Sequence, residues 1–398
     1  MLGLNELRKA AQRSGARDIG NIEIDVILTH LLQLFDEKKI TTHAAFKGGT
    51  MLRKMVFGPR GRLSTDLDFT CRTDISNDDL MMEVLGVLGE PYRGLRFKIA
   101  DKDWYQTDEG CAVNPVCSHE HNEKGVNIKL QFSMRERPIL PVVAVAQIKQ
   151  DYFENLGFDP AAIPSLAFEE AVAEKIRAAS QRSKIRDLHD LSEIAARDLN
   201  RGLIRSLAVL KLWNSGGPGL DYARFAERVK GAGDYDIADL ANLLRNDQKP
   251  DLEAMMKRVV EGFRFLNDLS EAEKALAADT ERKKQQEADA LIETLAPAAE
   301  RRDKAKRERL RDSAAQARCV PMTPSKRRRY PPRSARSLLR RIFPASSRAA
   351  SPRSRSRAAA CSSPGARADA RPAPPAQAAR PRWPARSAHV RAGPGHRP

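Results

Sequence analysis

Two short runs of residues carry the side chains best suited to phosphate chemistry. The first is Lys47-Gly48-Gly49-Thr50, and the second, sixteen positions further on, begins at Asp66 and includes Asp68. A glycine-rich turn between a strand and a helix offers backbone N–H groups that bind phosphate oxygens. The two glycines let the backbone approach a ligand closely, and the Thr50 hydroxyl can donate one more hydrogen bond. The first run therefore predicts a site for the phosphates of a nucleotide.

The second run predicts a metal site beside the first. Asp66 and Asp68 occupy alternate positions of a segment whose apolar residues also alternate, so both carboxylates project from one face of a strand. Two adjacent carboxylates repel each other unless a divalent cation lies between them, which is how Mg²⁺ is held against a nucleoside triphosphate. Either run alone is common in structural roles. Together, in the order strand, turn, helix, strand, they predict nucleotide binding with Asp66 and Asp68 as ligands of Mg²⁺.

The spacing of apolar residues predicts the elements that must position these runs. Helical spacing over Ile22–Phe35 predicts a helix, and residues 44–46 are expected to form a brief strand that enters the glycine-rich turn. A short helix is expected over Thr50–Phe57. Alternating apolar and polar residues predict strands over Asp66–Cys71 and Val126–Ser133.

The second half of the chain has a different pattern. From Phe168 to about Leu295 the apolar spacing is helical, with glycine-rich interruptions near residues 215–219 and 231–233. The sequence therefore predicts an α/β fold of the α+β type, in which a mixed half precedes a helical half. The boundary is expected near Ile163.

Charge is distributed very unevenly along the chain. The net charge is +17, but residues 319–398 alone hold 18 arginines and one lysine against one acidic residue. The preceding residues are nearly neutral, so bulk charge is no argument for nucleic-acid binding. The basic tail also contains 14 of the 24 prolines, a composition that cannot bury a core. It is either a disordered RNA-binding tail or, as the abrupt change at about residue 319 favours, a frameshift product.

Cysteine usage and hydropathy predict the compartment. The five cysteines are scattered and odd in number, which does not indicate a disulfide framework and fits a reducing cytosol. The longest strongly apolar stretch is about half the length of a membrane span. We therefore expect a cytoplasmic protein with no membrane partner.

The two runs resemble a known family. Phe46–Thr50 followed by Arg62–Phe69 is similar to the AbiEii/AbiGii-type nucleotidyltransferase toxins, relatives of the polymerase-β-like nucleotidyltransferases. The resemblance covers most of residues 20–200 and extends more thinly to about residue 270. It implies a nucleotidyltransferase core with a small mixed sheet in residues 1–163 and a helical domain in residues 164–300, which leaves residues 301–398 as the basic tail.

The resemblance also implies a function. Members of the family are toxins of bacterial toxin–antitoxin systems, often phage-defence modules, and each has a cognate antitoxin as partner. They are thought to bind a nucleoside triphosphate with Mg²⁺, and some transfer nucleotides to the acceptor end of tRNA.

Carried over residue by residue, the family's motifs divide into two sets. The N-terminal set matches the phosphate-binding turn and the metal pair, with Arg62 and Ser64 in the Arg-x-Ser just ahead of that pair. The C-terminal set places a lysine and an arginine at Lys175 and Arg182, followed by Asp187 within Arg186–Leu191. The resemblance thus implies these site residues: for nucleotide binding, Lys47, Gly48, Gly49, Thr50, Arg62, Ser64 and Arg182; as candidate catalytic residues, Asp66, Asp68, Lys175 and Asp187.

One position departs from the family. Related enzymes often carry a third carboxylate on a later strand, where this chain has the neutral Gln131. An amide neither acts as a base nor holds a metal as strongly as a carboxylate. Either two carboxylates suffice, or another residue such as Asp187 completes the site, or activity is reduced.

Several of the candidate site residues have both a functional and a structural interpretation. Lys175 and Arg182 are two helical turns apart and are expected on one helix face, where they could neutralise phosphate charge or pair with Glu170 and Glu174. Asp187 is either a general base or an organiser of the site. The neighbours Trp104 and Tyr105 are expected to be packing residues in preference to a base-stacking platform.

The sequence thus predicts a toxin that transfers a nucleotide from a nucleoside triphosphate, with Mg²⁺, to an RNA such as the tRNA acceptor end or to a protein. Two alternatives remain open. One is a phosphotransferase on the same scaffold, and the other is a catalytically silent nucleotide-binding antitoxin or partner, which Gln131 favours.

Overall fold

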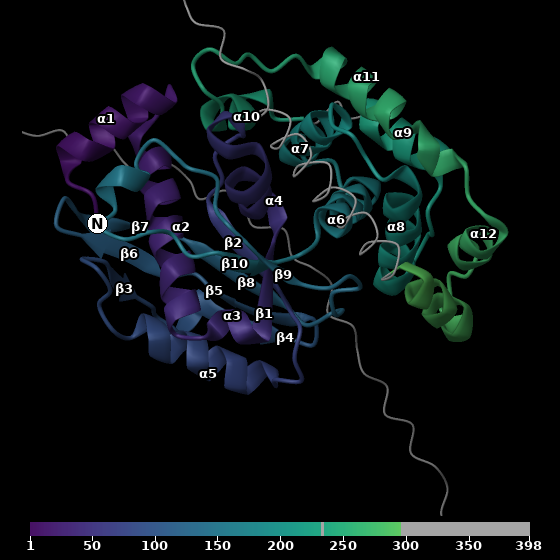
Figure 1. Cartoon of the computed structure of the whole chain (residues 1–398), viewed down its shortest axis with the longest axis horizontal. Coiled ribbons are helices and arrows are strands. Elements are labelled where there is room, and N and C mark those ends of the chain that lie inside the picture. The colour runs from purple at the N-terminus through teal and green to yellow at the C-terminus, as the bar shows by residue number, and fades with distance from the viewer. Residues whose placement is uncertain (232–234, 296–398) are drawn as a thin grey trace, which may run out of the picture. The chain divides into compact units, whose positions relative to one another are not determined.

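The computed structural model describes residues 1–231 and 235–295, and a mixed sheet organises the first half of this chain (Figure 1). The strand order in the seven-stranded sheet is β4-β5-β8-β2-β1-β10-β9. The pairs β1/β10 and β2/β8 are parallel and the other neighbours are antiparallel. The strands are β1 Ala44–Lys47, β2 Asp66–Cys71, β4 Trp104–Thr107, β5 Gly110–Val113, β8 Lys129–Ser133, β9 Val143–Val145 and β10 Ile163–Ser165. The predicted α/β class with a small mixed sheet is confirmed.

The two faces of the sheet have opposite character. Phe46, Phe69 and Phe132 lie on one face of β1, β2 and β8, and the Phe69 and Phe132 rings stack with centroids 5.0 Å apart. Phe35 of helix α2 (Ile19–Glu37) packs against them, with its ring centroid 5.8 Å from that of Phe69. Because side chains alternate along a strand, the neighbouring polar residues must project from the other face. The sheet is thereby an apolar core on one side and a polar platform on the other.

The remaining elements of the first half surround this sheet. A second, three-stranded sheet has the order β3-β6-β7. The strand predicted over Val126–Ser133 is in fact two strands that part at Ile128, so one end of it belongs to each sheet. The other elements are α1 Leu4–Ser14, α3 Ile40–His43, α5 Asn77–Leu88, β3 Arg96–Lys98, β6 Val116–His119, β7 Asn122–Asn127, and the 3-10 turns η2 Gly58–Arg60, η3 Asp101–Asp103 and η4 Phe153–Asn155.

The helix predicted after the glycine-rich turn is present but unusual. It starts as α4 (Gly48–Met51) and continues as the π-helix η1 (Leu52–Phe57). Lys54 in this segment is fully buried, and its ammonium donates to the Asp25 carboxylate at 3.0 Å and to the Thr29 hydroxyl at 2.8 Å. Tyr152 completes the network by donating to the same carboxylate at 2.7 Å. A buried charge needs such partners, and these fix the segment against α2.

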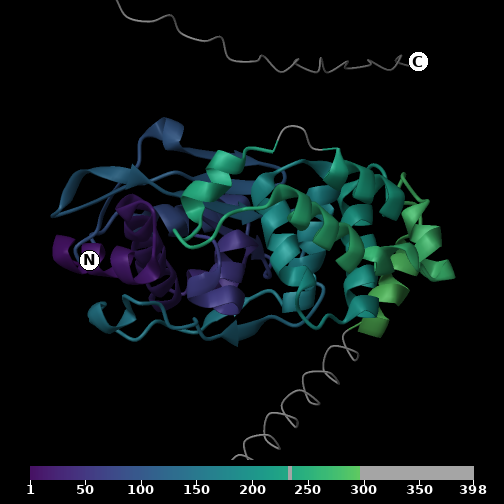
Figure 2. The same cartoon turned by 90° about the horizontal axis from the view of Figure 1, so that it is seen from above.

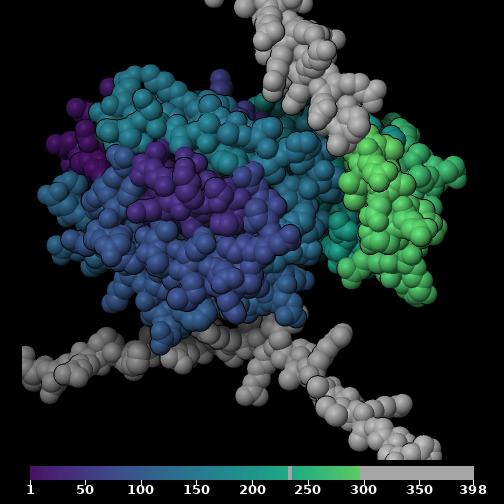
Figure 3. All heavy atoms as spheres, turned by 60° about the horizontal axis from the view of Figure 1, so that its bottom comes forward, coloured from purple at the N-terminus to yellow at the C-terminus, as the bar shows by residue number. Residues whose placement is uncertain are grey.

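The second half is helical, as predicted, and lies beside the sheet (Figure 2). Its central helix α6 packs against both α7 and α8. In the space-filling view the N-terminal half and the last described helices occupy opposite sides of the visible face (Figure 3). The elements are α6 Phe168–Gln181, α7 Ile185–Ala195, α8 Arg201–Ser215, α9 Tyr222–Lys230, α10 Ile237–Leu243, α11 Leu252–Gly262, η5 Arg264–Asn267 and α12 Glu271–Ala277.

All the described residues belong to one compact unit. The division into a core and a helical domain at residue 163 stays a prediction. Within the described residues, every helix is too short or too polar to cross a membrane. The basic tail predicted over residues 301–398 lies outside them.

Candidate functional site

The polar face of the sheet brings the two predicted runs together. Lys47 on β1 lies directly opposite Asp68 on β2, and Asp68 lies directly opposite Gln131 on β8. Residues paired in this way project from the same face. Gln131 therefore stands beside Asp68, where the family pattern has its third carboxylate.

The glycines of the turn are explained by close approaches. Gly48 has a φ of +85°, which favours glycine, and a Cβ added there would overlap the Asp68 carboxylate. A Cβ on Gly49 would overlap the Arg62 guanidinium. The turn thus lies tightly between an acidic and a basic side chain, and any larger residue would displace one of them.

The aspartate pair is electrostatically unfavourable by itself. Burial and the neighbouring Asp66 charge together raise the pKa of Asp68, although Lys47, Lys175 and Lys129 partly offset them. Among the residues that the structure describes, no cation forms an ion pair with Asp66 or Asp68. A positive charge carried by a ligand would be stabilised here, because two carboxylates repel each other unless a cation lies between them.

The opposite side of the site is a network of paired charges. The Lys175 ammonium on α6 lies 2.9 Å from an Asp187 oxygen and 2.8 Å from an Asp190 oxygen, both on α7. Arg62 makes two parallel hydrogen bonds to Asp190, at 2.8 and 2.7 Å. Such bidentate pairs are among the strongest in proteins. Sequence reasoning missed Asp190 as a site-organising residue, although it lies in the motif that contains Asp187.

The pKa values in this network move in the direction of the charged forms. Burial disfavours each charge, but Arg62 and Lys175 outweigh it and hold the pKa of Asp190 well below its usual range. Lys175 and Arg182 likewise lower the pKa of Asp187 against its burial, and the two aspartates raise the pKa of Lys175 against its burial. A carboxylate with a lowered pKa is a weak base, so this geometry favours Asp187 as an organiser of Lys175.

Arg182 reaches the network by a different route from the one predicted. Helix α6 ends at Gln181, and Arg182 follows it in an extended conformation, so it does not share a helix face with Lys175. The Arg182 side chain still donates to Asp187, at 2.9 Å, and is 59% exposed. The two cations are brought together by a common carboxylate instead of by helical spacing.

Three of the predicted residues are buried beside the turn. The Thr50 hydroxyl donates to the Asp66 carbonyl, which fastens the turn to β2. Arg62 and Ser64 are also buried, and Arg62 is fully engaged with Asp190. In this state these side chains hold the site together and do not line the cavity.

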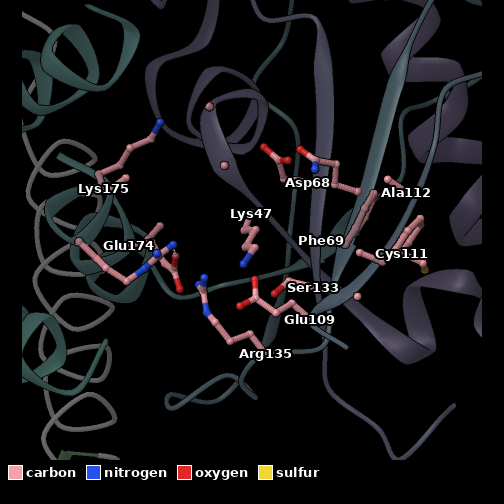
Figure 4. Close-up of a pocket in the computed structure, with 18 of the residues that line it drawn as sticks. Lys47, Asp68, Phe69, Glu109, Cys111, Ala112, Ser133, Arg135, Glu174 and Lys175 are labelled. Atoms are coloured by element: carbon pink, nitrogen blue, oxygen red, sulfur yellow. Dashed lines mark hydrogen bonds and ion pairs between the residues drawn. The ribbon is translucent and has the colours of Figure 1, made fainter. Parts of the chain in front are cut away.

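A cavity of about 400 Å³ lies between the polar face of the sheet and helix α6 (Figure 4). The predicted residues that line it are Lys47, Gly48, Gly49, Asp68, Lys175, Arg182 and Asp187, whereas Thr50, Arg62, Ser64 and Asp66 are outside the lining. Asp66 remains on the same strand face, two residues before Asp68.

Sequence reasoning missed a second part of the lining. It comes from the β4–β5 hairpin and from the end of β8, with Glu174 and Arg177 of α6 opposite: Tyr105, Thr107, Glu109, Gly110, Ala112, Ser133 and Arg135. The prediction that Trp104 and Tyr105 are packing residues is wrong, since they are 38% and 45% exposed, and the base-stacking role set aside for them stays open. No motif marks these residues, and only the strand register places them beside the aspartate pair.

Comparisons with known proteins identify the family to which these residues belong. Residues 30–278 match a family model described as the nucleotidyl transferase AbiEii toxin of type IV toxin–antitoxin systems. No curated protein matches the chain significantly.

One solved structure gives the same indication. MenT4, a nucleotidyltransferase toxin from Mycobacterium tuberculosis H37Rv, is 29% identical with a TM-score of 0.62, over 74% of this chain and all of MenT4. Two Helicobacter pylori proteins, a putative nucleotidyltransferase and JHP933, are each 19% identical over 61% of this chain. They are covered to 95% and 91%, with TM-scores of 0.39 and 0.36.

Proposed function

The chain belongs to the AbiEii family of nucleotidyl transferase toxins of type IV toxin–antitoxin systems, and from this premise we propose that it transfers a nucleotide from a nucleoside triphosphate to an RNA hydroxyl, with the tRNA acceptor end as the first candidate. The observation that carries the proposal is the arrangement around one cavity. The Gly48-Gly49 turn and Asp68 form one side of it, and Lys175 forms the other.

The geometry of the turn supports it as the donor site. The backbone N–H groups of Gly48 and Gly49 lie at the start of a helix, where anionic phosphate oxygens are favoured. Lys47 lines the same cavity and forms no ion pair within the described residues, so its ammonium is available to a phosphate. Arg182, being largely exposed, can turn toward the triphosphate.

The aspartate pair fits a divalent cation. Within the described residues no cluster of three or more metal-binding side chains is present, so a cation would be held by Asp66 and Asp68 together with phosphate oxygens of the substrate. This is how Mg²⁺ is usually bound, by one or two carboxylates plus substrate phosphates. When bound, it would neutralise charge that develops on the phosphate during the transfer.

Lys175 has the complementary role. Its ammonium is held by Asp187 and Asp190 at a fixed place on the cavity wall. A pre-oriented cation stabilises the developing negative charge of the transferring group without having to reorganise. Asp187 and Asp190 act through Lys175 and are positioning residues.

The biological setting follows from the family. We propose a cognate antitoxin as partner, abortive phage defence as the role, and the cytoplasm as the place of action. The alternative of a catalytically silent partner is less well supported, because the matching family model and MenT4 are both described as nucleotidyltransferase toxins.

The test uses purified protein, Mg²⁺, total tRNA and nucleoside triphosphates labelled at either the α- or the γ-phosphate. The α-label should enter the RNA, and Asp68→Ala should reduce transfer by about 10²- to 10³-fold, the scale of a lost electrostatic catalytic group. Entry of the γ-label alone would show a phosphotransferase, and equal transfer by the variant would overturn the assignment of Asp68.

A further inference from the structure

The cavity extends well beyond the residues assigned to phosphate and metal. The register of the sheet continues the row of Lys47, Asp68 and Gln131 to Ala112 on β5 and Tyr105 on the edge strand β4. All five side chains project from the same face. Neighbouring strands lie about 4.8 Å apart, so Tyr105 stands roughly 14 Å from Asp68 along the row. That span is comparable to the distance from a metal-bound phosphate to the far end of a nucleotide.

The floor between Gln131 and Tyr105 is nearly free of side chains. Ala112 contributes a methyl group. Gly110 has a φ of +142°, and a Cβ there would overlap the Phe132 carbonyl, so only glycine fits. On the opposite wall, Ala171 and Ala178 of α6 are also small. The cavity is therefore a slot with one flat side, a shape suited to a planar ring.

Tyr105 forms the end of this slot, on a strand that is held in place. Its side chain is 45% exposed and lines the cavity. Helix α5 fixes the strand that carries it, because Asn77 donates to the Thr107 carbonyl at 2.8 Å and Gln106 donates to the Asn77 carbonyl at 3.3 Å. An exposed aromatic ring on a fixed strand is available for stacking at little entropic cost.

Polar groups border the slot on the side of β8. Arg135 extends toward Glu174 and Lys47 in the close-up (Figure 4). Arg135 lines the cavity, and its guanidinium can donate to polar atoms at the edge of a ring. Ser133 and Thr107 add hydroxyl groups beside the flat floor.

From these observations we propose that the β4–β5 hairpin forms a nucleobase subsite, in which a base lies over Ala112 and Gly110 and stacks on Tyr105. The inference rests on the proposed function, since the base belongs either to the donor nucleotide or to the end of the acceptor. A purely apolar ligand fits less well, because Arg135, Ser133 and Thr107 make the border of the slot polar.

The experiment measures dissociation constants by titration calorimetry with Mg²⁺ present, for ATP, GTP, CTP, UTP and inorganic tripolyphosphate. It compares the wild type with Tyr105→Ala, Tyr105→Phe and the matched control Trp104→Ala. Trp104 is the neighbouring exposed aromatic on β4, but its side chain projects from the other face of the strand. Thermal melting establishes that each variant is folded.

The second measurement is the KM for total tRNA in the transfer assay. Stacking on an aromatic side chain corresponds to about 10-fold to 100-fold in affinity. If the donor base occupies the subsite, Tyr105→Ala weakens nucleotide binding by that factor and leaves tripolyphosphate binding unchanged. If the acceptor base occupies it, nucleotide binding is unchanged and the KM for tRNA rises instead. In both cases Tyr105→Phe and Trp104→Ala stay within about twofold of the wild type.

Three results would overturn the subsite. The first is that Tyr105→Ala changes neither quantity, and the second is that it weakens tripolyphosphate as much as the nucleotides. The third is that Trp104→Ala has the same effect as Tyr105→Ala. Each leaves the proposed function standing if the wild type binds triphosphates and transfers label. Failure of the wild type to bind any triphosphate would instead refute the proposed function, and this inference with it.

Discussion

Two pairs of aspartates contribute to this site, and the protein treats them in opposite ways. Asp187 and Asp190 on α7 are neutralised by cations from three segments of the chain. Asp66 and Asp68 on β2 have no ion-pair partner among the described residues. The pKa of Asp190 lies well below its usual range, whereas the pKa of Asp68 is raised.

The difference separates charges that hold the fold from charges that await a ligand. A buried carboxylate paired with two cations is part of the structure, because removing it leaves those cations uncompensated. A carboxylate beside a like charge contributes little to the fold and is retained for another reason. Structural carboxylates are thus those whose opposite charge comes from side chains of the protein, and site carboxylates are those whose opposite charge would come from a ligand.

The largest effect on stability is expected from removing a carboxylate of the paired aspartates, Asp187 and Asp190. Asp190→Asn leaves Arg62 and Lys175 facing a neutral amide, and loss of one partner of a buried pair costs about 3–5 kcal/mol of folding free energy. Asp187→Asn should cost less, because its partner Arg182 is 59% exposed and remains hydrated. Urea unfolding measures both. A cost below about 1 kcal/mol for Asp190→Asn would contradict a structural role.

The paired side should also depend on pH in a defined direction. A lowered pKa in the folded state means that the stabilisation by Asp190 is present above the pKa of an unfolded aspartate, about 3.9, and is lost as pH falls below it. The difference in stability between wild type and Asp190→Asn should therefore be constant from about pH 7 to 5 and shrink below about pH 4. If the stability difference between wild type and Asp190→Asn already shrinks between about pH 7 and 5, the partners of Asp190 do not hold it in its charged form.

A third carboxylate can be added beside the unpaired aspartates, Asp66 and Asp68, by a substitution at Gln131. Gln131→Glu adds a like charge directly opposite Asp68 and should destabilise the protein by up to about 1 kcal/mol without metal. Mg²⁺ should then raise the melting temperature more in this variant than in the wild type, since more negative charge is neutralised. The neutral variant Gln131→Met is the control. Equal Mg²⁺ responses of all three proteins would place the cation away from Gln131.

The smallest effect on stability is expected at Asp68. Asp68→Asn removes a carboxylate whose pKa is raised by burial and by Asp66, so stability should stay unchanged or increase by up to about 1 kcal/mol. The transfer activity should nevertheless be lost. A destabilisation of more than about 2 kcal/mol would mean that the chain itself compensates this charge, and the contrast with Asp190 would then disappear.

Much of the fold and part of the site were predictable from the residues alone. The helix around Ile22–Phe35, the strand–turn–helix at Gly48 and the helical second half follow from apolar spacing and breaker residues, which are local signals. Helix boundaries were less predictable, as Arg182 demonstrates: the helix ends one residue before it. The π-helix at Leu52–Phe57 contains Lys54, which is buried against α2, a contact that local spacing does not encode.

The sequence by itself determined the chemistry: a glycine-rich turn, an Asp-x-Asp pair and a downstream lysine belong to a nucleotide-handling site because of their types and order. Tertiary structure decided the partners. Asp190 organises the site because α7 packs where Arg62 can bind it. Tyr105 lines the cavity because of the register of β4, β5 and β8. The physical reason is that an ion pair across 128 positions, or a row across five strands, arises from packing between elements that are distant in the chain.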